Sequence, residues 1–187
     1  MNDEKTILSD SNSKMQKSVQ VFREDLKTIR TSRASPDLIE NLTADYYGAS
    51  TPLNQMASIT VPDARLLMIQ PWDKQALGEI EKSILQSDLG LVPNNDGTVI
   101  RISIPILTEE RRKDLVKLVG RRLEDSRIAV RNIRREGVDQ IKKLENSKQL
   151  SSDDSRVAQQ DIQKITDSNI QQLETLAKDK EKEVMEV

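Results

Sequence analysis

Histidine and cysteine are absent from this 187-residue chain, and only four of its residues are aromatic. Without histidine and cysteine, the chain lacks the usual general base, the commonest metal ligand and a thiol nucleophile. Its six glycines are scattered, so no glycine-rich loop is available to cradle a phosphate group. These absences favour a binding protein over an enzyme, and we expect neither a cofactor nor a metal site.

Long apolar runs are missing as well. No segment approaches the length that crosses a membrane, and Met1–Glu4 lack the basic and apolar regions of a secretory signal. We therefore expect a cytoplasmic protein with no membrane partner. Apolar residues make up 35% of the chain, which is too little for one large continuous core and favours elongated helices.

The few aromatic residues are unevenly placed. Trp72 and the pair Tyr46 and Tyr47 could stack on nucleic-acid bases. Single aromatic residues in a small domain more often belong to the core or to its rim, and we prefer that interpretation.

Positive charge is concentrated in residues 111–135, which hold eight Arg and two Lys against three acidic residues. This segment carries a net charge of +7, whereas the whole chain carries −2. The rest of the chain is therefore acidic and has no general attraction to polyanions. A surface for nucleic acid is expected on this one segment.

Within that segment, several arginines follow one helical face. Arg127, Arg131 and Arg134 are separated by steps of four and three, and Arg135 follows directly. The planar fork of arginine suits bidentate contacts with phosphate or base edges. The alternative is a charged face that is simply solvated, as on many long helices. No acidic residue interrupts residues 126–135, and this favours nucleic-acid binding.

All six prolines lie between Pro36 and Pro105, together with four of the six glycines and three of the four aromatic residues. Proline breaks helices and marks turns and strand ends, so this segment differs from its helical flanks. The predicted fold is α+β. Residues 1–31 and 106–187 form a three-helix bundle, and residues 32–105 form a domain inserted into it.

Apolar stripes predict the three helices. The first ends near Thr31, the second covers residues 108–146, and the third begins at Ser152. Asp153 and Asp154 suit the positive end of the third helix dipole better than a metal site. The third helix is expected to bury its apolar residues, which are Val157, Ile162, Ile165, Ile170, Leu173 and Ala177.

The inserted segment alternates between apolar and polar residues. Residues 57–61 and 99–104 are predicted strands, and residues 66–69 are a more buried one. Residues 74–87 have the pattern of an amphipathic helix, and Asn94–Gly97 indicates a turn. We expect a small β/α/β sandwich whose helix covers its sheet.

The chain passes twice between the two predicted domains, near Ser32 and near Pro105. The first helix is expected to end where the second begins, so the two passages should lie close together. Two short connections of this kind make a natural hinge.

Five segments resemble the ribosome recycling factor family, in the same order and at the same spacing. They are Ile29–Pro36, Tyr46–Gly48, Ser87–Leu91, Leu107–Leu115 and Ala129–Arg135. The resemblance implies a three-helix bundle with an inserted β/α/β domain, arranged like an L. This agrees with the fold that the periodicity predicts.

The resemblance also implies a function. Proteins of this family act with elongation factor G, which hydrolyses GTP, to split the bacterial ribosome into subunits after termination. The helical domain is expected to contact ribosomal RNA of the large subunit, and we expect a monomer. A ribosome-associated stability or hibernation factor, which binds RNA without splitting subunits, is the alternative.

Two sets of candidate residues follow. Arg112, Arg131 and Arg134 match the family, and with Arg127 and Arg135 they form the predicted RNA-binding set.

The predicted hinge set is Arg30, Thr31, Ser32, Arg33 and Pro105. The family usually has glycine where this chain has Ser32. If the backbone there needs a positive φ, serine is strained and the hinge is less mobile.

Overall fold

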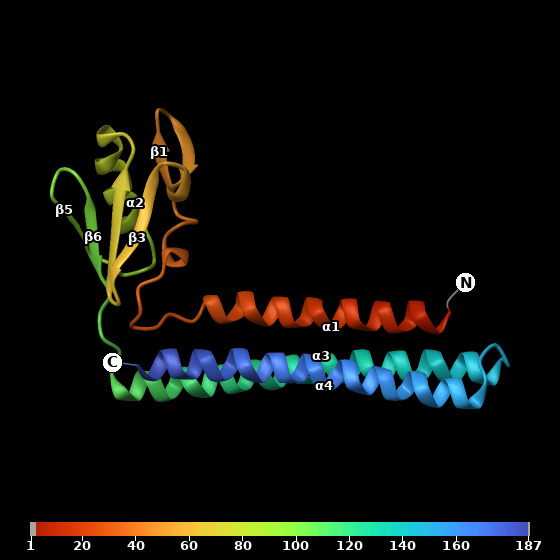
Figure 1. The fold of residues 1–187 in the computed structure, drawn as a ribbon. Coiled ribbons are helices and arrows are strands. Elements are labelled where there is room, and N and C mark those ends of the chain that lie inside the picture. Colours follow the sequence, from red (N-terminus) through yellow and green to blue (C-terminus); the bar gives the residue numbers. More distant parts are fainter. Residues whose placement is uncertain (1–2, 187) are drawn as a thin grey trace. The chain divides into compact units, whose positions relative to one another are not determined.

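The computed structural model describes residues 3–186, and the chain divides into two compact units. The residues up to Ile29 and Glu110–Met185 form the first, which we call the helical unit. Arg30–Glu109 form the second, which we call the sheet unit. The long helices lie in the helical unit, and the strands lie with a shorter helix in the sheet unit (Figure 1).

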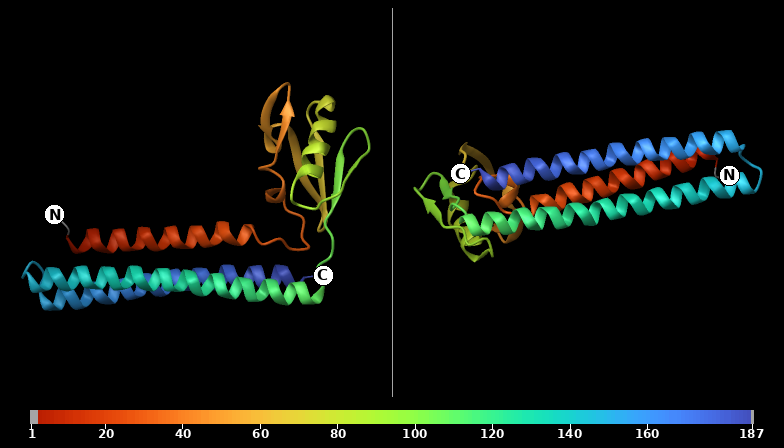
Figure 2. Two further views of the ribbon diagram at one scale, coloured as in Figure 1. Left: turned by 180° about the vertical axis from the view of Figure 1, so that it is seen from behind. Right: turned by 90° about the horizontal axis from the view of Figure 1, so that it is seen from below.

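The helical unit is a three-helix bundle, as the stripes predicted. Its helices are α1 (Glu4–Lys27), α3 (Glu109–Asn146) and α4 (Ser152–Met185). They run side by side in every view (Figures 1 and 2).

The predicted end of the first helix, near Thr31, was wrong. The helix α1 ends at Lys27, because Thr28 caps it with a hydroxyl that donates to the carbonyl oxygen of Asp25. Ile29 lies beyond the cap but is still buried, at 4% exposure. The apolar stripe therefore continues past the helix, and the pattern alone could not locate its end.

Local side chains fix the other helix ends. Asp3 caps α1 by accepting from the backbone N–H of Thr6 at 2.8 Å. Between α3 and α4 the chain reverses through Lys148, whose φ is +58°. Ser151 then caps α4, because its Oγ accepts from the N–H of Asp154 at 3.1 Å.

The core of the bundle contains polar positions that an apolar pattern passes over. In α4 the buried face includes Ser155, Thr166 and Asn169. Asn169 is satisfied there, since its Nδ2 donates to the carbonyl oxygen of Ile165 at 2.8 Å and its Oδ1 accepts from Gln16 at 2.9 Å.

The expectation that Val157 lies in the core was wrong, because 52% of it is exposed. Ala158 is fully buried at the neighbouring position, one residue further round the helix.

Gly137 marks a close approach of the three helices. A Cβ atom at this position would lie 2.8 Å from the Cδ1 of Ile162 in α4 and 2.8 Å from the Oγ of Ser11 in α1. Both residues are themselves buried. Gly137 is therefore buried where α3 packs closely against α1 and α4.

The sheet unit contains a hairpin, a four-stranded antiparallel sheet and a helix. The hairpin pairs β1 (Thr43–Tyr46) with β2 (Ala49–Pro52). The sheet has the order β3-β4-β6-β5. Its strands are β3 (Ala57–Asp63), β4 (Leu66–Pro71), β5 (Pro93–Asn95) and β6 (Ile100–Ser103), and the helix is α2 (Leu77–Gln86). Short 3-10 helices lie at Pro36–Leu38, Leu53–Gln55 and Lys74–Ala76.

The helix α2 packs on the sheet through alternate residues of the central strands. Leu67 of β4 is opposite Ile102 of β6, and Ile69 is opposite Ile100. All four side chains are fully buried. Ile80 and Ile84 of α2 join the same apolar cluster. This confirms the predicted layers, in which a helix covers a sheet whose residues alternate with period two.

Candidate nucleic-acid interface

The basic segment forms part of one unbroken helix, α3. Residues 127–135 therefore project from a rigid rod, and Figure 1 shows that rod running along the bundle beside α4. The structure brings four of the predicted RNA-binding residues together here, which are Arg127, Arg131, Arg134 and Arg135.

Arg127 is held within the bundle. Its guanidinium donates to Glu174 of α4 at 2.5 Å and to Glu124 at 3.4 Å, and only 27% of its side chain is exposed. The hydrogen bond to Glu174 is the main reason why the pKa of Arg127 is raised above its ordinary value. Arg127 therefore links α3 to α4, whatever else it contacts.

Arg131 and Arg134 each make fewer side-chain contacts within the bundle than Arg127 does. The Nη1 of Arg131 donates to Glu124 at 3.0 Å, and 44% of its side chain is exposed. The Nη1 of Arg134 donates to the amide oxygen of Gln163 at 3.1 Å, which is an uncharged partner. A guanidinium has five N–H donors, so each arginine keeps donors for a second partner.

Arg135 is exposed, and within residues 3–186 its side chain has no hydrogen-bond or ion-pair partner. Together with Arg131 and Arg134 it gives α3 a positive surface, in which Arg131 is the one arginine paired with a carboxylate, that of Glu124. We call these three residues the arginine face.

Arg112 lies apart from the arginine face. It precedes Arg131 by 19 residues on the same helix, a distance of roughly 28 Å at 1.5 Å per residue. Its Nη1 donates to the carbonyl oxygen of Met185 at 3.5 Å, so it lies where α3 begins and α4 ends.

Sequence reasoning missed a second basic group at that end of the bundle. Lys113 and Lys117 of α3 lie across from Lys178 and Lys182 of α4, and together they line a groove of about 620 Å³. Each pair is spaced by four residues and so shares one helical face. The antiparallel course of the two helices could have indicated this juxtaposition.

Arg122 was also missed, and its role is structural. Its Nη1 donates to a carboxylate oxygen of Asp25 at 2.6 Å and to the carbonyl oxygen of the same residue at 3.0 Å. It therefore fastens α3 to the end of α1.

The predicted hinge residues lie in the sheet unit, near the two points at which the chain enters and leaves that unit. Arg30 donates to the carbonyl oxygen of Leu89 at 3.0 Å. The hydroxyl of Thr31 accepts from the N–H of Arg33 at 3.2 Å. Pro105 is exposed.

Ser32 joins the two connecting segments, because its Oγ accepts from the N–H of Leu107 at 3.1 Å. The concern that Ser32 is strained was wrong. Among residues 3–186, the non-glycine residues with positive φ are Tyr47 and Lys148. A glycine could not make the side-chain hydrogen bond of Ser32.

Across residues 3–186 no group of three or more His, Cys, Asp and Glu side chains is placed to hold a metal ion. None of the helices in this range is long and apolar enough to cross a membrane.

A profile of the ribosome recycling factor family matches residues 22–185. The chain belongs to this family. Over 183 residues it is 56% identical to the ribosome-recycling factor of Listeria monocytogenes serotype 4a, covering 98% of this chain and 99% of the relative. The ribosome-recycling factor of Bacillus pumilus is 52% identical over the same length, with the same coverage. The resemblance carried by the five segments is thus confirmed.

Solved structures of the family have the same fold. A solution structure of the ribosome recycling factor is 38% identical, with a TM-score of 0.79 over the full length of both chains. The second is the T. thermophilus ribosome recycling factor, described with E. coli elongation factor G on the E. coli post-termination complex. It is 48% identical, covers 99% of this chain and all of its own, and has a TM-score of 0.69.

Proposed function

We propose that this chain acts with elongation factor G to split post-termination ribosomes into subunits. The observation that carries the proposal is similarity over nearly the whole chain to a ribosome recycling factor described together with elongation factor G on a post-termination complex. Because the similarity spans the helical unit and the sheet unit alike, it supports a function that needs both.

Within this function, we propose that the arginine face binds ribosomal RNA of the large subunit. Arg134 can exchange the neutral amide of Gln163 for a phosphate without losing an ion pair. Arg135 needs to give up no partner, whereas the charge of Arg131 is already paired with Glu124. These differences predict that Arg134 and Arg135 contribute most to RNA affinity.

The remaining predicted residues take different parts in this proposal. Arg112, which lies beside the lysine-lined groove, would add a second RNA contact near the start of α3. Arg127 is held by two carboxylates, so its exchange for phosphate would break two ion pairs. We assign Arg127 mainly to the stability of the face.

We also propose that residues 30–33 and Pro105 form a hinge between two domains, residues 1–31 with 106–187 and residues 32–105. The hydrogen bond from Leu107 to Ser32 ties the two connecting segments to each other. The two connecting segments would then bend together instead of independently.

A subunit-splitting assay tests the function. Post-termination ribosomes would be mixed with this protein, elongation factor G and GTP, and light scattering would be followed. Scattering should fall when all three are present and stay constant when either protein is left out. Binding to ribosomes with no fall in scattering would contradict the proposal and favour the stability or hibernation factor.

A further inference from the structure

The lysine-lined groove between α3 and α4 combines positive charge with apolar surface. Its volume is about 620 Å³, and Glu181 is the one acidic residue beside its four lysines. The groove therefore carries an excess of three positive charges. Val116 and Met185 line it as well. A partner that fills this groove has to match both the charge and the apolar side chains.

Apolar surface stays accessible in the groove. Met185 is 49% exposed, and Val116 is half-buried. The methylene stems of the lysines extend this surface, because a lysine can lie along apolar groups while its ammonium stays in water. Methionine adapts its shape to different partners and is common at binding surfaces. Phosphate groups alone would leave these apolar contacts unused.

Three of the four lysines have no partner within residues 3–186. Lys117, Lys178 and Lys182 are exposed, and none of them forms a hydrogen bond or an ion pair there. On the same helix as two of them, Lys180 pairs with Glu183 at 3.2 Å. The ammonium groups of the groove are therefore available to carboxylates from outside the bundle.

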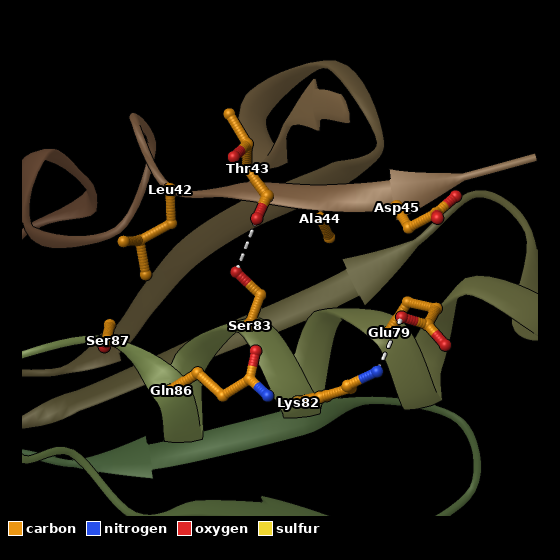
Figure 3. A pocket seen from close by; sticks show the side chains of 9 residues that line it. All are labelled: Leu42, Thr43, Ala44, Asp45, Glu79, Lys82, Ser83, Gln86 and Ser87. Atoms are coloured by element: carbon orange, nitrogen blue, oxygen red, sulfur yellow. Dashed lines mark hydrogen bonds and ion pairs between the residues drawn. The ribbon is translucent and has the colours of Figure 1, made fainter. Parts of the chain in front are cut away.

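A hollow of the sheet unit shows the opposite arrangement. Between β1 and α2, Lys82 pairs with Glu79 at 4.0 Å, and the hydroxyl of Ser83 donates to the carbonyl oxygen of Thr43 at 2.7 Å (Figure 3). These polar groups satisfy one another within the unit. The lysine-lined groove differs because its charge is left unmatched.

The unmatched lysines also repel one another. Lys113 and Lys117 on α3, and Lys178 and Lys182 on α4, are each spaced by four residues, and like charges at this spacing destabilise a helix. The helix dipole favours cations at the end of α4 but disfavours them at the start of α3, so it accounts for one pair at most. An acidic partner would relieve the repulsion in both pairs.

We propose that the lysine-lined groove docks an acidic amphipathic helix of a partner protein. Apolar side chains of that helix would lie on Val116 and Met185, and its glutamates or aspartates would pair with the lysines on either side. Residues 178–185 advance roughly 10 Å along α4, which corresponds to about two turns of a docked helix.

This docking site is separate from the proposed RNA contacts. Arg112 is not among the residues that line the groove. Lys117 precedes Arg131 of the arginine face by 14 residues on α3, a distance of roughly 21 Å. The groove and the arginine face can therefore be occupied by different partners.

Peptide binding tests the proposal. The probe is a fluorescein-labelled peptide of about 15 residues with leucines at helical spacing and glutamates elsewhere, and its anisotropy is followed as full-length protein is added. We expect saturable binding. A peptide of the same composition, with its leucines spread over all faces, should bind at least about fivefold more weakly. Equal binding of the two peptides would overturn the proposal.

Two double variants test the charge. Lys178→Gln with Lys182→Gln should raise the dissociation constant of the peptide roughly tenfold, since two charge-assisted contacts are lost. The matched control, Lys142→Gln with Lys143→Gln, removes the same charge from exposed positions near the other end of α3. It should leave the affinity within about a factor of two. An equal loss in both variants would mean that the peptide senses only net charge, against the proposal.

Met185→Gln tests the apolar part of the groove. Because Met185 is the last residue of α4 and half-exposed, this variant should melt at the parental temperature while its peptide affinity falls at least about threefold. Unchanged affinity would contradict the apolar contact. A single-stranded oligouridine that binds more tightly than the peptide, and that Lys178→Gln with Lys182→Gln weakens while Met185→Gln does not, would replace the protein partner by RNA.

Discussion

Gly137 offers a sharp test of the bundle, because Gly120 on the same helix provides a matched control. A methyl group at Gly137 would meet Ile162 and Ser11 at 2.8 Å each, whereas a methyl group at Gly120 would meet no atom within 4 Å. Gly120 is also exposed. Glycine→Ala at the two positions thus differs in packing alone.

The magnitudes follow from two opposing effects. Alanine favours a helix interior over glycine by about 0.5–1 kcal/mol, which acts at both positions. Overpacking a buried site costs about 1–3 kcal/mol, and this acts only at Gly137. We therefore expect Gly120→Ala to raise the free energy of unfolding by about 0.5–1 kcal/mol and Gly137→Ala to lower it by about 1 kcal/mol.

Urea denaturation followed by circular dichroism at the helix band measures both changes. Combining Gly137→Ala with Ile162→Val, which removes the Cδ1 atom that the new methyl group would meet, should cost less than the sum of the two single changes. Equal stabilisation by Gly137→Ala and Gly120→Ala would refute the close helix contact.

Three further outcomes are expected. Arg127→Ala should lower the free energy of unfolding, measured in urea, by about 0.5–1 kcal/mol, because it breaks a link between helices. Arg135→Ala should change it by less than about 0.5 kcal/mol. The opposite ranking would contradict a structural role for Arg127 and a free surface position for Arg135. Asp96, whose pKa is lowered to about 2 mainly by the backbone N–H groups of the turn it closes, stabilises the fold above its ordinary pKa of 3.8. Its contribution should be lost as the pH falls from about 4 to about 2, and acid titration of Asp96→Asn should lack that loss. Ser32→Gly should speed hydrogen exchange at the amide of Leu107 and lower the free energy of unfolding by about 1 kcal/mol. An unchanged exchange rate would mean that the hydrogen bond is not formed in solution.

The bundle was predictable because long amphipathic stripes depend on period alone. What the stripes could not indicate is that polar residues occupy the buried face of α4. Thr166 and Asn169 satisfy their side chains on carbonyl oxygens four residues earlier, so they tolerate burial while an apolar count assigns them to the surface. Val157 was placed in the core for that reason.

The small strands escaped prediction because their sequences carry little pattern. The strand β1 has polar residues on both sides of its single buried Ala44, and β5 begins with a proline inside a segment that reads as a turn. The turn between β1 and β2 also lacks the residue pair that usually indicates a hairpin. The left-handed position of this turn holds Tyr47 where asparagine is usual.

The arginine face was predictable as a run of charge, but its internal partners were not. Arg127 meets Glu174, which lies 47 residues away in the sequence, and Arg134 meets Gln163, which lies 29 residues away. Only the packing of α3 on α4 brings these pairs together. That packing decides which arginines form ion pairs within the bundle and which keep their guanidinium groups free of carboxylate partners.

The most direct test of the account is the affinity for large ribosomal subunits, measured against salt concentration for Arg134→Ala with Arg135→Ala. The matched control is Lys142→Ala with Lys143→Ala, two exposed lysines near the end of the same helix. If the arginine face neutralises two phosphates, the double arginine variant should bind more weakly and its salt slope should be shallower by about two. The lysine control should keep the parental slope. A parental slope in the arginine variant would contradict the assignment of RNA binding to the arginine face.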